Sequence, residues 1–308
     1  MYDLTIVMYH YVRPIKASIF PRIKGLELQG FKRQLDFLEE RYTIVSSDQI
    51  ITAISGGKNL PPNACWLTFD DGYKDHFKYV LPELLKRNLS GAFFPPRIAI
   101  ETNTMLNVNS IHHILACNNN IKDLINELHE ACLAHGFEES FLSSLYEENA
   151  LPNRWDNADI IYFKRMLQYL LPEDERTSIT ASLFKKYIGI TESEFSSELY
   201  MNLREVRQMI NSGMYVGSHG SQHHWLDKIS IKDQRRDIQD SLSFLESVGA
   251  PTKQWIMCYP WGAYNNDTLS ALRETGALIG LTTEVRKANI LRDEPLTLPR
   301  FNTNDFPQ

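Results

Sequence analysis

Short apolar runs alternate with helical patterns through the first hundred residues. Continuous apolar runs of four to eight residues are typical of buried strands, and apolar residues spaced three or four apart are typical of amphipathic helices. The strands predicted in this way are 4–8, 42–45, 64–69 and 91–94. The predicted helices are 31–38, 47–54 and 80–85, the second of them capped by Ser47.

The pattern of apolar residues changes between about residues 101 and 200. Strand-length runs disappear, and the helical patterns 121–134, 159–171 and 173–187 dominate. Pro152 and Pro172 separate them. We predict a helical insertion, either a small subdomain or a lid that would cover a groove and restrict the access of polymers.

The alternation then resumes, and its order predicts the fold. The later predicted strands are 214–219, 255–259, 277–283 and 296–300, and the helices are 203–210, 238–245 and 266–272. Strands that alternate with helices favour parallel pairing through crossover connections. Polar clusters follow several strands at their carboxyl ends, where barrel enzymes build their sites. We therefore expect one α/β domain over 1–308, a deformed (β/α) barrel with about 101–200 inserted.

The composition argues against some classes of function but does not indicate a particular one. The 308 residues are 43% hydrophobic and carry a net charge of −6, which gives no general attraction to nucleic acid or anionic membranes. No apolar run reaches the roughly 18 residues of a transmembrane helix. The first residues contain no basic segment followed by a signal-length apolar run, so we expect a cytoplasmic protein. The four cysteines form no CxxC pair and are expected to be free thiols, and the oligomeric state is not indicated.

Two groups of residues suggest a metal site. Asp70 and Asp71 end an apolar run before Gly72, and a cation would relieve the repulsion between the two carboxylates. Taken alone, this tripeptide is more often a turn before a helix. His219 and His223 would share one face of a helical turn and, with one aspartate, make three ligands with an open position, as in catalytic zinc sites. The second aspartate would then be free to act as a general base. An isolated HxxxH is more often a buried or surface histidine pair.

These residues resemble a known family, the polysaccharide deacetylases with a NodB homology domain (carbohydrate esterase family 4). The family's TFDDG motif occurs at 68–72, and its H[ST]xxHxxL motif occurs at 219–226 with Gly220 in place of Ser or Thr. Its third motif resembles the Tyr-Pro-Trp-Gly sequence at 259–262. The resemblance covers about 1–98 and 201–303.

The resemblance implies roles for individual residues. Asp70 would be the general base, and Asp71, His219 and His223 would bind a divalent metal, with zinc the default and cobalt, nickel or iron also suited. Tyr259 and Trp261 would line the groove, and the Tyr259 backbone N–H would stabilise the oxyanion. Cys258 occupies the position where the family has a base-orienting arginine. Arg300 is a candidate substitute, with a purely structural arginine as the alternative.

The chain is most similar to the branch that deacetylates poly-N-acetylglucosamine. In that branch an early MYH-type motif, here Met8-Tyr9-His10, supplies the general-acid histidine. We therefore expect His10 to protonate the amine leaving group, against the alternative of a strand-end histidine held by hydrogen bonds.

The resulting hypothesis is a metal-dependent N-deacetylase acting on an N-acetylated amino sugar in a polysaccharide, oligosaccharide or glycan precursor. Two alternatives remain open at this point. One is a carbohydrate-binding protein that keeps the barrel without turnover, and the other is a deacylase of a different sugar ester or amide. The expected cytoplasmic location favours a lipid-linked or nucleotide-linked sugar as substrate.

Overall fold

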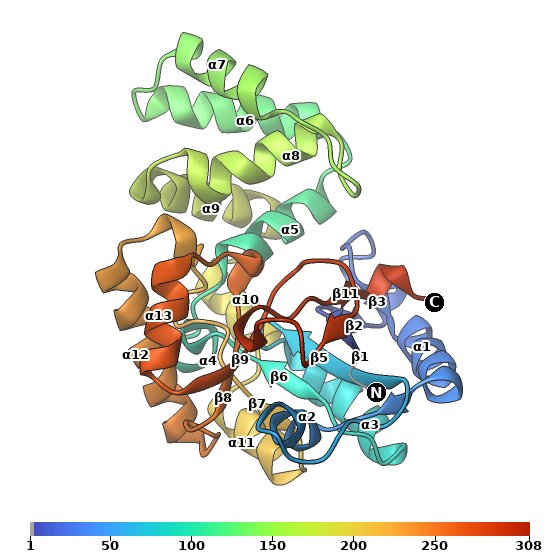
Figure 1. Ribbon diagram of the computed structural model, residues 1–308. Coiled ribbons are helices and arrows are strands. Elements are labelled where there is room, and N and C mark those ends of the chain that lie inside the picture. The colour runs from blue at the N-terminus through green and yellow to red at the C-terminus, as the bar shows by residue number, and fades with distance from the viewer. Residues whose placement is uncertain (1–2) are drawn as a thin grey trace. The chain divides into compact units, whose positions relative to one another are not determined.

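The computed structural model describes residues 3–308, so Met1 and Tyr2 of the predicted domain lie outside the described residues. The chain forms two compact units (Figure 1). The barrel unit contains the chain up to Pro14, Gly25–Asn103 and Ser197–Gln308. The helical unit contains Thr104–Ser196 together with Ile15–Lys24, a segment that the sequence did not indicate.

Parallel strands form the wall of the barrel unit. β1 (Asp3–Tyr9), β5 (Ala64–Asp70), β6 (Ala92–Phe94) and β7 (Tyr215–Val216) are neighbours in that order. All seven residues of β5 are buried, as expected for a parallel strand covered on both faces. The other strands are β2 (Val12–Arg13), β3 (Leu26–Glu27), β4 (Thr43–Ile44), β8 (Trp255–Cys258), β9 (Ala277–Leu281), β10 (Ala288–Asn289) and β11 (Phe301–Asn302).

Single bridges close the strands into a ring. Ser218 pairs with Met257 of β8, and β8 pairs with β9 in parallel. Leu281 then pairs with Leu298, and β11 returns to β1 with Val7 opposite Phe301. The predicted deformed (β/α) barrel is confirmed by this closure.

The predicted strand 296–300 is reduced to the single bridge at Leu298. Residues Pro295–Thr297 form a 3-10 turn, and the paired residues of β11 begin only at Phe301. Pro295 and Pro299 have no N–H to donate, so a continuous ladder cannot form across this segment.

The helices expected from the sequence alternate with the barrel strands, and one further helix, Arg97–Glu101, was not predicted. They are α1 (Leu28–Arg41), α2 (Ser47–Ile54), α3 (Leu81–Lys86), α4 (Arg97–Glu101), α11 (Leu203–Asn211), α12 (Ile231–Val248) and α13 (Asn266–Glu274), with a π-helical turn, η2 (His76–Val80), before α3. The cap of α2 is Ser46 rather than the predicted Ser47, because the Ser46 side chain accepts from the Gln49 N–H.

The helical unit has its own apolar core. Its helices are α5 (Asn107–Cys117), α6 (Ile121–Ala134), α7 (Glu139–Asn149), α8 (Ala158–Arg165), α9 (Glu173–Ile188) and the first part of α10 (Glu192–Leu199), and α8 continues into a π-helical turn, η3 (Met166–Leu170). Leu128, Tyr162, Phe163 and Phe184 are fully buried within the unit. Among residues 3–308, no helix combines the length and apolarity needed to cross a bilayer.

Candidate active site

The residues singled out by the sequence meet at the carboxyl ends of the barrel strands. Asp70 is the last residue of β5, His10 follows β1, and Cys258 ends β8. Arg300 immediately precedes β11. All of them belong to the barrel unit.

Asp71, His219 and His223 form a compact set of ligand atoms. Oδ1 of Asp71 lies 3.3 Å from Nε2 of His219 and 3.4 Å from Nε2 of His223. The Nδ1–H of His219 donates to the Cys258 carbonyl oxygen at 2.7 Å, which leaves Nε2 as the ligand nitrogen. This donor chemistry, two imidazoles and one carboxylate within 4.8 Å of one another, fits a divalent cation.

The backbone turns sharply after β5 and so directs the Asp71 side chain toward the two histidines. Asp71 and Gly72 have φ values of 70° and 69°. A Cβ on Gly72 would lie 2.7 Å from the Pro95 Cβ, so only glycine fits. The Tyr73 hydroxyl donates to Oδ2 of Asp71 at 2.5 Å, and the two histidines hold the pKa of Asp71 well below its usual range even though burial opposes ionisation.

The helical turn expected to join His219 and His223 is wrong. No helix runs through residues 219–225, and His223 has a φ of 57°. The imidazoles nevertheless converge, with ring centroids 4.9 Å apart. A folded loop therefore brings them together, and Gly220, with a φ of 71°, replaces the family's usual Ser or Thr at a position that favours glycine.

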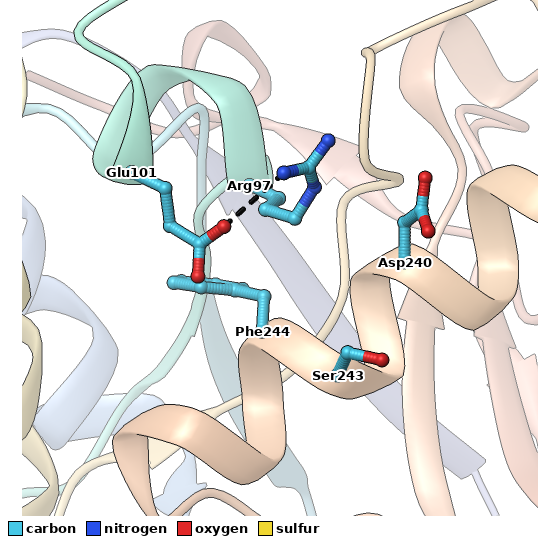
Figure 2. A pocket seen from close by; sticks show the side chains of 5 residues that line it. All are labelled: Arg97, Glu101, Asp240, Ser243 and Phe244. Carbon is cyan, nitrogen blue, oxygen red and sulfur yellow. Dashed lines mark hydrogen bonds and ion pairs between the residues drawn. The ribbon is translucent and has the colours of Figure 1, made fainter.

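Two residues that the sequence did not indicate hold this loop. The carboxylate of Asp237, on α12, accepts the N–H groups of Ser221 and Gln222 at 2.8 Å each. Nε of Arg97, on α4, donates to Oγ of Ser221 at 2.7 Å. Figure 2 shows Arg97 paired with Glu101 at 3.2 Å, in a hollow bordered by α12. Asp237 lies 11 residues after the second motif and Arg97 lies 25 residues after the first, so neither motif identifies them.

Asp70 is bound by Arg300 through both carboxylate oxygens. Nη1 donates to Oδ1 at 2.9 Å and Nη2 to Oδ2 at 2.8 Å. Arg300 is itself fixed by donating to the Thr282 carbonyl oxygen at 2.9 Å and to the Thr68 hydroxyl at 3.2 Å. Burial alone would raise the pKa of Asp70, but Arg300, with help from His219, lowers it to about 2.

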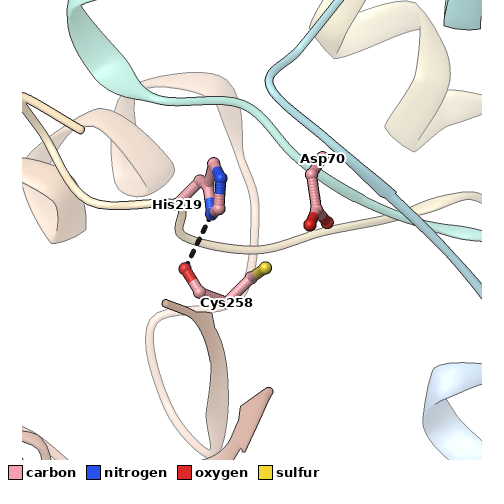
Figure 3. Close-up of side chains that lie close together, drawn as sticks. All are labelled: Asp70, His219 and Cys258. Carbon is pink, nitrogen blue, oxygen red and sulfur yellow. Dashed lines mark hydrogen bonds between the residues drawn. The ribbon is translucent and has the colours of Figure 1, made fainter. Parts of the chain in front are cut away.

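Cys258 lies beside Asp70 and His219 (Figure 3). One ligand atom from each of these three residues also falls within 4.8 Å of the others. Burial raises the pKa of the Cys258 thiol, which disfavours the thiolate that a metal would require. The Asp71 set is therefore the better metal site.

His10 lies at the exposed side of this group. Its Nε2 is 4.0 Å from Oδ2 of Asp70, and its side chain is 40% exposed. The His10 carbonyl oxygen is hydrogen-bonded by Nε2 of the buried His76 at 2.9 Å. The backbone of His10 is thus anchored while its imidazole remains accessible to a substrate.

Tyr259 cannot play the predicted oxyanion role in this structure. Its N–H donates to the Leu281 carbonyl oxygen at 3.1 Å, and its buried hydroxyl donates to the Leu296 carbonyl oxygen at 2.7 Å. The strand pairing of β8 with β9 therefore uses the N–H that was expected to face the substrate. The N–H of Trp261, whose φ is 62°, has no acceptor among the residues that the structure describes.

The Trp261 side chain contributes to an aromatic surface. Its ring stacks on Trp225 at 4.9 Å with an interplanar angle of 12°, and it meets the His223 ring at 5.6 Å. Both tryptophans are partly exposed. The histidines of the helical unit, by contrast, join no ligand cluster among residues 3–308.

The chain is similar to known polysaccharide deacetylases. The family model described as "Polysaccharide deacetylase" matches residues 179–279, which contain the second and third motifs. A putative polysaccharide deacetylase of Bacillus subtilis, YxkH, is 28% identical over 85 residues. That match covers 28% of this chain and 30% of the relative. The resemblance expected from the motifs is confirmed.

Solved structures extend the similarity to the whole fold. A deacetylase of Streptococcus pyogenes, PplD, in complex with acetate, superposes with a TM-score of 0.58 at 17% identity, over 97% of this chain and 92% of that one. The deacetylase domain of BpsB from Bordetella bronchiseptica gives 0.57 at 15% identity, over 98% and 96%. A de-N-acetylase from Aggregatibacter actinomycetemcomitans gives 0.54 at 16% identity, over 98% and 95%. At these identities the agreement establishes the fold.

Proposed function

We propose that this protein is a metal-dependent hydrolase that removes the acetyl group from an N-acetylated amino sugar. The observation that carries the proposal is the arrangement of two adjacent carboxylates with separate partners. Asp71 faces His219 and His223, whereas Asp70 is held by Arg300. This division provides a metal-binding set and an independent base within one turn of the chain.

Asp71, His219 and His223 would hold the cation. Two histidines and one carboxylate suit zinc, and cobalt, nickel and iron accept the same ligands. When bound, such an ion acidifies a water molecule and polarises the acetamide carbonyl. The hydrogen bond from Nδ1 of His219 to the Cys258 carbonyl oxygen puts the proton of the neutral imidazole on Nδ1, so that Nε2 would offer its lone pair to the cation.

Asp70 would accept the proton from the attacking water. Its pKa of about 2 keeps it ionised throughout the working pH range, so it is always available as a proton acceptor. The double hydrogen bond from Arg300 fixes the orientation of the carboxylate. A base with so low a pKa is weak, and it therefore depends on a water made acidic by the bound ion.

His10 would supply the proton that the leaving amine needs. Its imidazole lies beside Asp70 and is open to solvent, which suits a group that must meet the substrate nitrogen. The Trp261 N–H replaces that of Tyr259 as the backbone donor to the oxyanion. Attack of water on the carbonyl carbon and cleavage of the C–N bond then yield acetate and a free amino sugar.

The test is acetate release by the metal-loaded protein. We expect mass-spectrometric loss of one acetyl group from at least one member of a panel of N-acetyl sugars, sugar nucleotides and short oligomers. Asp70→Asn should abolish turnover while the zinc content stays near that of the wild type. Asp240→Asn, which removes an acid from the surface of α12, is the control. Binding of sugars with no turnover of any would instead favour the carbohydrate-binding alternative, and turnover of esters alone would favour the deacylase alternative.

A further inference from the structure

The helical unit contains a pocket of its own. It has a cavity volume of about 260 Å³ and is lined by the segment Ile15–Lys24 together with α5, α6 and α8. Its volume lies just under the roughly 300–1,000 Å³ typical of small-molecule sites. The pocket can therefore accept a small molecule but not an oligosaccharide.

Positive charge predominates in the lining. Arg22, Lys24 and Lys164 are cationic, and Asp156 is the one acidic residue among those that line the pocket. Asp156 is buried and pairs with both lysines, at 2.5 Å with Lys24 and 2.7 Å with Lys164. Three positive charges against one negative charge leave a net charge of about +2 at the pocket.

Arg22 has an unused binding edge. Its Nε donates to the Ala116 carbonyl oxygen at 2.8 Å, which anchors the guanidinium at the end of α5. Neither Nη1 nor Nη2 has a partner within the part of the chain that the structure describes. A planar pair of free N–H donors matches two oxygens of a phosphate or carboxylate.

The other residues that line the pocket add two features that suit an anion carrying an organic group. Ile121 is the first residue of α6 and Asn157 caps α8, so two positive helix ends border the pocket and add to the charge of the side chains. Leu115, Leu124 and Ile160 provide apolar walls. An inorganic anion alone would leave these walls without contacts.

We propose that this pocket binds a small phosphate monoester whose organic group is apolar. The dianionic phosphate matches the net charge, Arg22 takes two phosphate oxygens, and the apolar walls take the ester group. The site is independent of the proposed deacetylase activity, because its residues belong to the helical unit.

Butyl phosphate is a suitable probe, with inorganic phosphate, butyrate and butanol as comparisons. We expect calorimetry on the full-length protein to give a dissociation constant of about 1 mM or tighter for butyl phosphate. Each comparison compound should bind at least about threefold more weakly, since it lacks either the dianion or the apolar group. Arg22→Lys keeps the charge but loses the paired donors, and Lys164→Met removes one charge, so each should weaken binding about tenfold. Lys185→Gln, an exposed lysine of the same unit outside the pocket, should leave binding unchanged.

Competition with vesicles identifies the source of the phosphate. If the protein sediments with phosphatidic acid vesicles and butyl phosphate releases it, the site binds a lipid headgroup. If the protein does not sediment with the vesicles, the site binds a free phosphate ester. Absence of butyl phosphate binding, equal affinity for butyrate, or an equal loss in Lys185→Gln would overturn the proposal. Circular dichroism of each variant checks that a loss of binding is not a loss of folding.

Discussion

At the scale of single residues, Asp70 and Asp71 are adjacent and chemically identical but contact different side chains in the structure. Asp71 leaves the strand with a positive φ and turns to the histidines, while Asp70 remains within β5 and faces Arg300. The sequence identified both aspartates and Arg300 as candidates, because they carry the motif or end an apolar run. It placed the oxyanion donor at Tyr259, since a motif does not reveal which N–H groups a neighbouring strand has already taken.

Arg300→Lys tests whether Arg300 orients the base. Lysine keeps the charge but cannot donate to both oxygens of Asp70, so we expect kcat to fall about tenfold or more. Arg300 lowers the pKa of Asp70, and its replacement should therefore move the acid limb of the pH–activity profile to higher pH. Arg300→Met, which leaves Asp70 buried without a counter-charge, should also cost about 3–5 kcal/mol of unfolding free energy. Arg286→Lys, an exposed arginine, is the control, and an unmoved acid limb in both Arg300 variants would contradict the assignment.

At the scale of elements, the loop from His219 to His223 depends on the helix that follows it. Neither histidine lies in regular structure, so the geometry must come from contacts with neighbours. Asp237 provides two such contacts, and Arg97 provides a third through Ser221. Hydrophobic periodicity located α12 but could not identify which of its polar residues faces inward to the loop.

Asp237→Ala should weaken metal binding without touching a ligand. The variant leaves the N–H groups of Ser221 and Gln222 without their acceptor, so the two histidines lose their fixed separation. We expect zinc affinity to fall about 10–100-fold, measured by competition with a chromogenic chelator. Asp240→Ala, one turn along the same helix, should retain wild-type affinity, and equal affinity in both variants would mean that the loop is held by other contacts.

The π-helical turn η2 buries an uncharged histidine. His76 is enclosed by the rings of Phe69, Tyr73 and Phe93, and burial lowers its pKa from 6.5 to about 4. Above pH 6.5 the histidine is neutral in both the folded and the unfolded chain. As the pH falls from 6.5 towards 4, only the unfolded chain takes up the proton, so stability is lost over that window.

His76→Gln should reduce this acid sensitivity. Glutamine can still donate to the His10 carbonyl oxygen but does not titrate. We expect the pH dependence of the unfolding free energy between pH 6.5 and 4 to be shallower than in the wild type, with a summed difference of about 3 kcal/mol. Urea titrations at several pH values measure it, with His135→Gln, an exposed histidine, as the control. Parallel curves for the wild type and His76→Gln would show that His76 does not drive the effect.

At the scale of the whole molecule, the sequence predicted the order of the barrel strands and helices but not the contacts that close the barrel. The strand and helix order could be read from apolar runs, because parallel strands buried on both faces leave a strong signal. The closure of the barrel through Ser218–Met257 and Leu281–Leu298 could not be predicted, because a single bridge requires no run of apolar residues. Nothing in the sequence indicated that Ile15–Lys24 belongs to the helical unit, where its buried Phe20 contacts the rings of His113 and Phe195.

The separation into two units predicts where a bound metal stabilises the chain. Asp71, His219 and His223 all belong to the barrel unit, and the helical unit has its own core. A ligand that binds only one unit stabilises that unit, by about 2.7 kcal/mol at a concentration one hundred times its dissociation constant. We therefore expect zinc to slow amide hydrogen exchange in peptides from the barrel strands, including 64–72 and 214–225, and to leave those from 121–188 unchanged.

Mass spectrometry of exchange in moderate urea would resolve the two units, because each then opens with its own free energy. His223→Ala provides the control, since it should remove the zinc effect from the barrel peptides. Equal slowing of exchange in both sets of peptides would mean that the units unfold as one cooperative structure. In that case the helical unit would respond to metal through the stability of the barrel, even though it supplies no ligand.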